Sequence, residues 1–511
     1  MSPMNRSLFF SALIATLCAV PAPAQLGDVT DAANAASTGR ISTNVAWGDY
    51  DGDGDYDLYV TNWAEAFLGD AINALFQNNG DGTFTNVTDA AALGANDFLP
   101  AGGNSTAAAW GDYDNDGDVD LYVADFFGQD ALLENDGGTF TEFGRAEGQI
   151  DLEKRGSETS VAWGDYDGDG FLDLYLGAYY YENELYENND GDGTFTQVTD
   201  QSALNDKRDT NDVNWVDYDN DGDPDLFVVN REQENALYRN DLETTGSFEE
   251  VFCALSLSDL EIGHKAAWAD YDNDGRLDVF VANAGANALY RNDGSDTFIN
   301  VAAAAGVRHS GSSWRTAAVA WSDYDGDGDF DLFLASGRED SFQDARGQTD
   351  VLYANQGDGT FYNSEEAAIG RSNRYHAAAA FADYDGNATP DLYVIDAGGL
   401  GAWPPSNLLL QNAGDQGGGN PTDRFIRVRV TGRGAGGTNR DGIGAQVRLL
   451  TTTGDTLSYQ QVMNTPNAPE LIFGTPFGFG TYTVQVFFPN SSTTVSIDTL
   501  PGEDPLQITE P

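Results

Sequence analysis

The stretch DYDGDGDYDLYV, Asp49 to Val60, places five aspartates within nine residues and then becomes apolar. Carboxylates at positions 1, 3, 5 and 9 of such a loop can direct their oxygens to one point, because the glycine at position 6 allows a tight turn. Oxygen ligands of this kind suit Ca²⁺, which binds about 6–8 oxygens at about 2.3–2.6 Å. Cys and His, the ligands typical of zinc and copper sites, are absent from the stretch. The pattern predicts a calcium site, with Mg²⁺ as the alternative.

The same loop begins again at Asp112, Asp165, Asp217, Asp270, Asp323 and Asp383. The predicted ligands are the side chains at positions 1, 3, 5 and 9 and the backbone carbonyl at position 7. They are Asp49, Asp51, Asp53, Asp55 and Asp57; Asp112, Asp114, Asp116, Asp118 and Asp120; Asp165, Asp167, Asp169, Phe171 and Asp173; Asp217, Asp219, Asp221, Asp223 and Asp225; Asp270, Asp272, Asp274, Arg276 and Asp278; Asp323, Asp325, Asp327, Asp329 and Asp331; and Asp383, Asp385, Asn387 and Asp391. The seventh loop has Asn387 at position 5 and Ala388 in place of the glycine, so we expect it to bind calcium weakly or not at all.

Repulsion between the carboxylates makes an ion part of the predicted fold. At about 4 Å, two like charges near a protein surface cost roughly 4 kcal/mol. An EF-hand needs a glutamate at position 12 and flanking helices, and neither fits here. A solvated acidic turn could explain one copy but not seven. We therefore expect about six or seven Ca²⁺ ions.

Each loop lies between two predicted strands, and two further strands follow in every repeat. The strand before the loop ends at Trp47, Trp110, Trp163, Trp215, Trp268, Trp321 or Phe381, which predicts packing of one sheet on the next. Four short strands in each of seven repeats predict an all-β fold, a seven-bladed β-propeller. The last repeat lacks a fourth strand, so we expect Leu26 to Thr30 to complete it and close the ring.

Composition and the N-terminus indicate an exported protein. Residues 1–24 have a short basic start, an apolar run and the Ala22-Pro23-Ala24 motif, typical of a cleaved signal peptide. Cleavage would leave Cys253 as the only thiol, without a disulfide partner. The formal net charge of -59 argues against nucleic-acid binding. We expect a secreted protein, or a periplasmic or cell-surface protein in a bacterium, and find no later membrane span.

The DxDxDGxxD loop followed by an apolar strand and an N-x-L-Y/F-x-N segment resembles the FG-GAP/VCBS repeat of integrin α-type propellers, across residues 25–414. After a linker at 415–423, residues 424–511 resemble the ASPIC/UnbV domain in Asn439 to Ala445, Phe477 to Gly480 and Val484 to Pro489. The sequence departs from that domain where Phe488 and Pro489 precede Asn-Ser, in place of the usual Trp-Pro-Ser-Gly. The arrangement is similar to the cartilage acidic protein family. The resemblance implies an extracellular calcium-binding protein in adhesion or matrix contacts.

Basic and aromatic residues gather in the connectors that lead into the first strand of each repeat. A meander places these connectors on the face opposite the acidic loops, where we expect a glycan or anionic ligand, or an extracellular protein, to bind. The candidate residues are Arg155, Arg208, His264, Lys265, Trp314, Arg315, Arg374, Tyr375 and His376. The alternative is that the cations pair with nearby acids such as Glu158 and Asp209. A secreted polysaccharide lyase or hydrolase is the competing function, since abundant Asp and Glu leave a catalytic carboxylate pair open.

Overall fold

The computed structural model describes the following parts of the chain: residues 26–37, 41–63, 72–91, 93, 104–143, 157–189, 191–198, 204, 207–242, 245–253, 255–257, 261–294, 297–309, 315–336, 349–364, 375–397, 406–413, 425–434, 437–451, 453–454, 456–475, 482–489, 491–497 and 505–511. The predicted signal peptide, the linker at 415–423, and Arg155, Trp314, Arg374 and Phe477 to Gly480 lie outside these residues. No helix in the described part is long and apolar enough to cross a bilayer.

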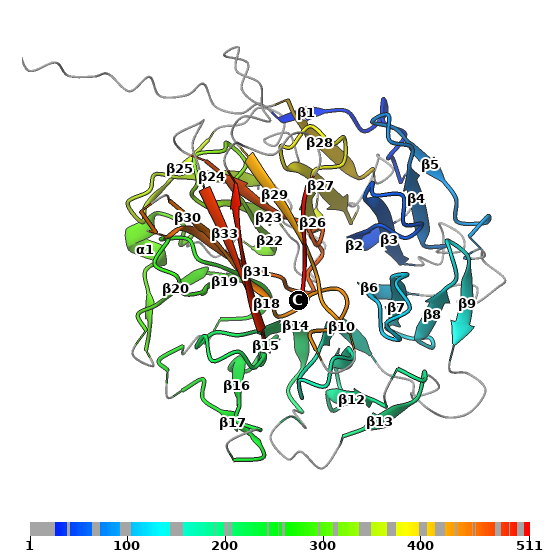
Figure 1. The fold of residues 1–511 in the computed structure, drawn as a ribbon, viewed down its shortest axis with the longest axis horizontal. Helices are drawn as coiled ribbons and strands as arrows, with labels where there is room; N and C mark the ends of the chain where they lie inside the picture. Colours follow the sequence, from blue (N-terminus) through cyan, green and yellow to red (C-terminus); the bar gives the residue numbers. More distant parts are fainter. Residues whose placement is uncertain are drawn as a thin grey trace, which may run out of the picture.

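The repeats form antiparallel four-stranded sheets, which confirms the all-β class. Their strands are β2 (Ile41–Gly48), β3 (Asp57–Trp63), β4 (Ala74–Asn78) and β5 (Phe84–Asn86); β6 (Ser105–Gly111), β7 (Asp120–Asp125), β8 (Ala131–Asn135) and β9 (Phe140–Phe143); β10 (Glu158–Gly164), β11 (Asp173–Ala178), β12 (Glu184–Asn188) and β13 (Phe195–Gln197); β14 (Thr210–Val216), β15 (Asp225–Asn230), β16 (Ala236–Asn240) and β17 (Phe248–Glu250); β18 (Gly263–Ala269), β19 (Asp278–Asn283), β20 (Ala288–Asn292) and β21 (Phe298–Asn300); β22 (Thr316–Ser322), β23 (Asp331–Ser336), β24 (Val351–Asn355) and β25 (Phe361–Asn363); and β26 (His376–Ala382), β27 (Asp391–Asp396) and β28 (Leu408–Asn412). Figure 1 shows these sheets in chain order around a common centre.

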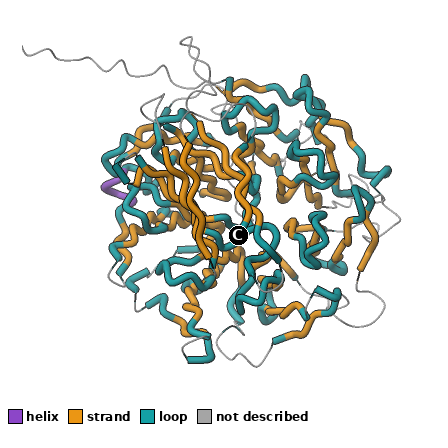
Figure 2. Tube along the Cα trace, in the orientation of Figure 1, coloured by secondary structure: helices purple, strands orange, loops and turns teal. Residues whose placement is uncertain are grey.

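The last of these sheets takes its fourth strand from the N-terminus. β1 (Leu26–Asp28) pairs antiparallel with β28, Leu26 opposite Asn412 and Asp28 opposite Leu410. This is the pairing that the missing fourth strand of the seventh repeat predicted, over a strand two residues shorter. A helix of one turn, α1 (Ala302–Ala305), follows β21 and is the helical element of the described residues (Figure 2).

The core lies between adjacent sheets. The second strand of each repeat is buried on both faces, as in Leu58-Tyr59-Val60 of β3. The six tryptophans that precede the loops, and Phe381 in the seventh repeat, are also buried. Trp163, for example, lies 6.3 Å from the ring of Tyr113 in the preceding repeat and 6.2 Å from Phe195 in its own. These residues pack sheet on sheet, as their position predicted.

A buried asparagine at the end of each third strand ties every sheet to the one before it. Its side-chain amide donates to the carbonyl of the tyrosine at loop position 2 in the preceding repeat, at 2.7–2.9 Å. The donors are Asn78, Asn135, Asn188, Asn240, Asn292, Asn355 and Asn412, and the acceptors are Tyr384, Tyr50, Tyr113, Tyr166, Tyr218, Tyr271 and Tyr324, respectively. The bond from Asn78 to Tyr384 joins the first repeat to the seventh.

The C-terminal strands form two further sheets, which we call the C-terminal module (residues 425–511). One sheet has the order β32 (Leu471–Gly474), β29 (Phe425–Thr431), β35 (Leu506–Thr509); the other has β31 (Thr456–Gln461), β30 (Gln446–Leu450), β33 (Tyr482–Phe488), β34 (Ser491–Ile497). The module crosses the face of the repeats that carries the acidic loops (Figure 1). Its contact is close, since a Cβ added to Gly474 would lie 1.8 Å from the Asp323 carboxylate.

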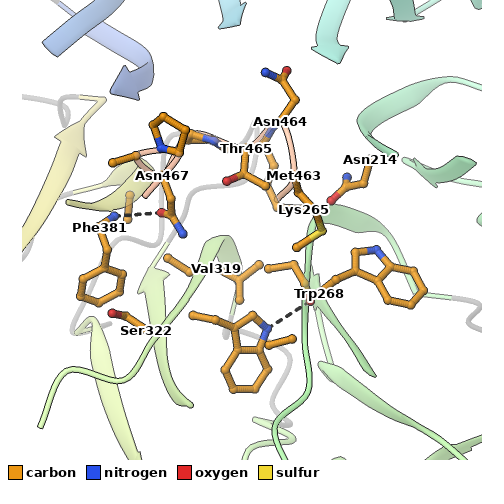
Figure 3. A pocket seen from close by; sticks show the side chains of 18 of the residues that line it. Asn214, Lys265, Trp268, Val319, Ser322, Phe381, Met463, Asn464, Thr465 and Asn467 are labelled. Atoms are coloured by element: carbon orange, nitrogen blue, oxygen red, sulfur yellow. Dashed lines mark hydrogen bonds between the residues drawn. The ribbon is translucent and has the colours of Figure 1, made fainter. Parts of the chain in front are cut away.

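The segment between β31 and β32 enters the centre of the repeats. The side chain of Asn464 bonds the carbonyl of Trp110 at 2.8 Å and the N–H of Trp163 at 3.2 Å, and Asn467 accepts the N–H of Phe381 at 2.9 Å. Figure 3 shows this segment, Met463 to Asn467, beside Lys265, Trp268 and Val319 of the first strands. A cavity of about 190 Å³ remains between the segment and those strands.

We predict that Asn188→Ala destabilises the protein by about 2–3 kcal/mol, because two buried carbonyls, of Tyr113 and Leu172, lose their donor. Asn189→Ala is the matched control, since its amide bonds Thr194 within a surface turn and should change stability by less than about 0.5 kcal/mol. Urea denaturation measures both. Equal effects of the two substitutions would show that the contact between sheets does not hold them together.

Candidate metal centre

Hydrogen bonds within each acidic loop fold it in one way in all seven repeats. The carboxylate at position 1 accepts the N–H of position 6 at 2.8–3.1 Å, and the side chain at position 5 accepts the N–H of position 7 at 2.7–3.1 Å. The residue at position 6 has a positive φ throughout, from 86° to 107° for the glycines and 68° for Ala388. The turn that glycine was predicted to allow is therefore present even in the seventh loop, where alanine takes the left-handed conformation at a steric cost.

The aspartate at position 9 has a role in every repeat that the sequence pattern did not reveal. One oxygen accepts the N–H of the tyrosine at position 2, and the other accepts the N–H of the third-strand asparagine. In the second repeat these bonds join Asp120 to Tyr113 at 3.2 Å and to Asn135 at 2.9 Å. This carboxylate fixes the loop to the sheet whether or not it also binds an ion.

Carboxylate oxygens converge in each of the first five loops. In the second to fifth repeats, positions 1, 3 and 9 offer three oxygens within 4.8 Å of one another: Asp112, Asp114 and Asp120; Asp165, Asp167 and Asp173; Asp217, Asp219 and Asp225; Asp270, Asp272 and Asp278. In the first repeat the group is Asp49, Asp51 and Asp53. In these five loops the structure groups three of the four predicted side-chain ligands. The groups do not include the position-5 aspartates of the second to fifth repeats or Asp57 of the first, and the carbonyl ligand at position 7 stays a prediction.

Buried carboxylate oxygens without a hydrogen-bond partner show what the loops can hold. Among the described residues, Oδ1 of Asp112 and of Asp165 is buried and accepts no hydrogen bond, while Oδ2 of the same group accepts the position-6 N–H. An ionised oxygen in that state is costly unless a cation lies beside it. A hard divalent cation would satisfy these oxygens, and the oxygen-only donor set fits Ca²⁺.

Burial raises the pKa of several loop carboxyls at positions 1 and 9 far above their usual range. Desolvation, reinforced by neighbouring aspartates, raises the pKa of Asp57, Asp112 and Asp165 to about 8 and that of Asp120 to about 9. The same causes raise the pKa of the position-9 aspartates Asp173 and Asp225 well above the ordinary value. Without a cation, the loops can stay buried at neutral pH only by retaining protons.

Arginines of the C-terminal module lie against three of the loops. Arg429 donates to the carbonyl of Gly54 at 2.8 Å in the first loop, and Arg440 donates to the carbonyl of Asn115 at 3.0 Å in the second. Arg427 forms a buried ion pair with Asp383, position 1 of the seventh loop, and contacts Glu470 at 3.4 Å. The arginines that the sequence places in this module therefore offset part of the acidity of the loop face.

The seventh loop differs from the others because the Arg427 guanidinium lies beside its first carboxylate. Burial raises the pKa of Asp383 only to about 6, since Arg427 acts in the opposite direction. Asn387, at position 5, donates its amide to the carbonyl of Asn412 and holds Thr389 with its oxygen. A cation from the chain itself thus offsets one carboxylate of the loop that has fewest, and weak or absent metal binding at this loop stays a prediction.

The module adds further polar groups to the loops that sequence reasoning missed. Asp441 accepts the N–H of Asp112 at 2.8 Å, and Gln446 donates to Asp217 at 2.6 Å. Tyr459 donates to Asn220 at 3.1 Å. Asp441 lies within the Asn439-to-Ala445 motif, which was the one sequence signal that could have pointed to this contact.

The basic connector residues lie opposite the loops, and several have acidic partners. Arg208 pairs with Glu250 at 3.0 Å, and Lys265 pairs with Asp212 at 2.7 Å. His376 is buried, and its Nδ1 lies 2.5 Å from Asp350. These three residues follow the alternative weighed above, contact with nearby acids, while His264, Arg315 and Tyr375 also have interactions within the chain. Ligand binding by this set stays a prediction.

The sequence model of the FG-GAP-like repeat matches residues 63–123, 112–176, 175–228, 217–281, 270–334 and 337–394, more than half of the chain. The chain therefore belongs to the FG-GAP-like repeat family. No curated protein sequence matches it.

Several solved propeller-like structures resemble it in fold. A lectin of Agrocybe aegerita that recognises terminal N-acetylglucosamine is 20% identical, with a TM-score of 0.40, over 64% of this chain and 79% of the lectin. The BP39L lectin of Burkholderia pseudomallei is 12% identical, with a TM-score of 0.45, over 70% and 93%. A rhamnogalacturonan lyase of Bacillus licheniformis is 13% identical, with a TM-score of 0.40, over 73% of each chain. At these identities the likeness concerns the fold alone.

Because burial raises these pKa values, we expect the metal-free protein to lose folding stability as the pH rises. An acid whose folded-state pKa exceeds its unfolded value contributes stability below the unfolded pKa, near 3.8, that is lost as pH rises through the folded pKa, about 8 for Asp112. We expect the melting temperature of dialysed, metal-free protein to fall by at least about 5 °C between pH 5 and pH 8. Calcium should abolish this fall. A metal-free melting temperature that rises over the same interval would contradict the buried, protonated loops.

The ion pair of Arg427 predicts a large effect of its removal. Arg427→Gln removes the guanidinium from the buried carboxylates of Asp383 and Glu470. The substitution should therefore lower the free energy of unfolding by about 3–5 kcal/mol. Asp383→Asn in the same background should recover part of the loss. Arg291→Gln, which breaks a surface pair with Asp293, is the control and should cost less than about 1 kcal/mol. Urea denaturation gives all three values.

Proposed function

We propose that this chain is a secreted, calcium-stabilised β-propeller that binds an extracellular ligand, a glycan or a protein. The observation that carries the proposal is the sevenfold acidic loop, folded alike in each repeat, with buried carboxylate oxygens that have no hydrogen-bond donor. Calcium at the first six loops would supply the missing positive charge, and the seven repeats would act as blades of one closed ring. The bond from Asn78 to Tyr384 and the pairing of β1 with β28 support that closure.

Export supports calcium as the ion. Residues 1–24 have the features of a cleaved signal peptide, and calcium is abundant outside cells. Cys253, the cysteine among the described residues, is free, so metal ions would take the stabilising role that disulfides have in many exported proteins. The six loops with a complete carboxylate set are the sites we assign to Ca²⁺.

We propose that the C-terminal module is an ASPIC/UnbV-type domain. Its position leaves one face of the repeats more accessible to a ligand than the other. It covers the acidic loops and sends the segment from Met463 into the centre of the repeats. The opposite face carries the connectors and the loops between second and third strands. A ligand from outside would therefore meet that opposite face, where adhesion or glycan recognition would take place.

A metal count tests the first half of this proposal. We expect elemental analysis of calcium-saturated, desalted protein to find six calcium ions per chain. At a free calcium concentration 100 times the Kd of a site, binding at that site should stabilise the fold by about 2.7 kcal/mol. Asp167→Asn, in the third loop, should reduce the count by one, whereas Asp192→Asn, in a surface turn of the same repeat, should leave it unchanged. Protein that binds no calcium and melts at the same temperature with and without chelator would refute the proposal.

Ligand binding tests the second half. Calcium-loaded protein should bind members of a glycan array or immobilised matrix proteins, and chelation should weaken that binding together with the melting temperature. The same incubations reveal the competing enzymatic function, because a lyase or hydrolase would release unsaturated products or new reducing ends.

A further inference from the structure

The face opposite the acidic loops carries a continuous row of aromatic side chains. Its members occupy one position of the repeat, six residues after the position-9 aspartate: Trp63, Phe126 and Tyr179, followed by Arg231 in the fourth repeat. The ring centroids of Trp63 and Phe126 lie 5.6 Å apart, and those of Phe126 and Tyr179 lie 6.1 Å apart. Arg231 stacks over the Tyr179 ring at 5.1 Å. We call these residues, with the adjoining Phe127, Tyr180 and Tyr181, the aromatic ladder.

The ladder spans four consecutive repeats and is absent from the next described ones. The equivalent residues of the fifth and seventh repeats are Ala284 and Ala397. The backbone is the same in these repeats, since Phe126, Tyr179, Arg231, Ala284 and Ala397 all donate their N–H to the connector before the first strand, at 2.7–2.9 Å. The row of rings is therefore a property of the side chains on one side of the face, and the repeat fold does not require it.

The outer rings of the ladder are exposed to solvent. Phe127 is 66% exposed, Tyr180 is 70% exposed and Tyr181 is 53% exposed. The ring centroid of Phe127 lies 5.8 Å from that of Trp63 and 4.8 Å from that of Phe126. Large apolar side chains gathered on a surface mark binding sites more often than scattered ones do. Core packing cannot account for these three residues.

The backbone that presents Tyr180 is strained. Its φ of 73° lies in the left-handed region, where a bulky side chain is rare. The N–H of Tyr180 donates to Oδ1 of Asp209 at 2.9 Å, and that of Tyr179 donates to the carbonyl of Ser157 at 2.8 Å, so the neighbouring connectors hold this conformation. Strain of this kind in an exposed aromatic residue is typical of a functional position.

Charge narrows the kind of partner. The chain has a formal net charge of -59, which disfavours acidic polysaccharides, acidic proteins and a second copy of the chain. Near the ladder, Lys207 pairs with Glu182, and the Arg231 guanidinium lies over the Tyr179 ring. The patch combines flat apolar rings with polar groups that interact within the chain. A neutral sugar chain matches it, because pyranose rings offer apolar C–H faces for stacking and hydroxyls for the polar rim.

We propose that the aromatic ladder binds a neutral glycan, whose successive sugar units stack along Trp63, Phe127, Tyr179 and Tyr180. This inference rests on the proposed ligand-binding function and specifies its site and ligand class. It places recognition on the rings of the first three repeats and assigns no contact to the paired cations Arg208 and Lys265.

Titration of calcium-loaded protein with cellohexaose, mannohexaose and hexagalacturonate tests this. We expect at least one neutral hexaose to bind and to change the tryptophan emission, because Trp63 lies within the ladder. Phe127→Ala combined with Tyr180→Ala should weaken that binding by about tenfold or more. Tyr362→Ala is the matched control, since Tyr362 is an exposed tyrosine on β25 away from the ladder, and it should leave the Kd unchanged. Tyr181→Ala gives a second reading if the double variant melts at a lower temperature.

The outcomes separate this inference from the proposed function. Two results would overturn the ladder as the site: a neutral hexaose that binds the ladder variants as tightly as the wild type, or binding of hexagalacturonate alone. Either result would still be compatible with the proposed ligand-binding function. Self-association of the wild type that the double variant abolishes would instead identify the ladder as an interface between copies, and would overturn the inference. Binding of no hexaose would also overturn it, while the calcium count and the effect of chelation would still decide the metal half of the proposed function.

Discussion

The fold depends on carboxylates that are both buried and structural. The position-9 aspartate of each loop joins two backbone N–H groups, one from the loop and one from the third strand, and the asparagine at that strand end reaches the preceding repeat. The same aspartate contributes to the cluster of like charges, as Asp120 does beside Asp112 and Asp114. Contact between sheets and electrostatic repulsion therefore arise from one set of residues. A protein built in this way needs a metal ion, a protonated carboxyl or an arginine side chain at every loop.

The structure uses the chain's own cations where it can. Arg429, Arg440 and Arg427 of the C-terminal module lie at the first, second and seventh loops, which are neighbours around the centre. At the seventh loop the pairing is buried and the carboxylate set is incomplete, so the guanidinium offsets the charge of Asp383 from within the chain. The position of the module and the electrostatics of the repeats are thus coupled: moving the module would expose or leave unpaired the charges beneath it.

This coupling divides the molecule into two faces with different roles. The loop face is covered, tightly packed at Gly474 and bound to the segment from Met463 that fills the centre. The opposite face presents connectors whose cations are largely paired and a one-sided row of exposed rings. On the second face the side chains differ between repeats while the backbone stays the same, as Tyr179, Arg231 and Ala284 show.

The sequence by itself determined the repeat, its four strands, the buried tryptophans and the pairing of β1 with β28. Each of these follows from local spacing and from a count of strands. It also located the loop carboxylates, since aspartates recur at positions 1, 3 and 9 of the loop in all seven copies. It could not reveal that Arg427 neutralises the seventh loop, that Asp441 lies beside Asp112, or that Trp63, Phe126 and Tyr179 form one row. Those residues are 44 to 329 positions from their partners or recur one repeat apart without a shared motif. Only the packing of module on repeats and of repeat on repeat brings them together, because contacts between distant segments depend on how the sheets and the module are arranged in space, which local spacing does not encode.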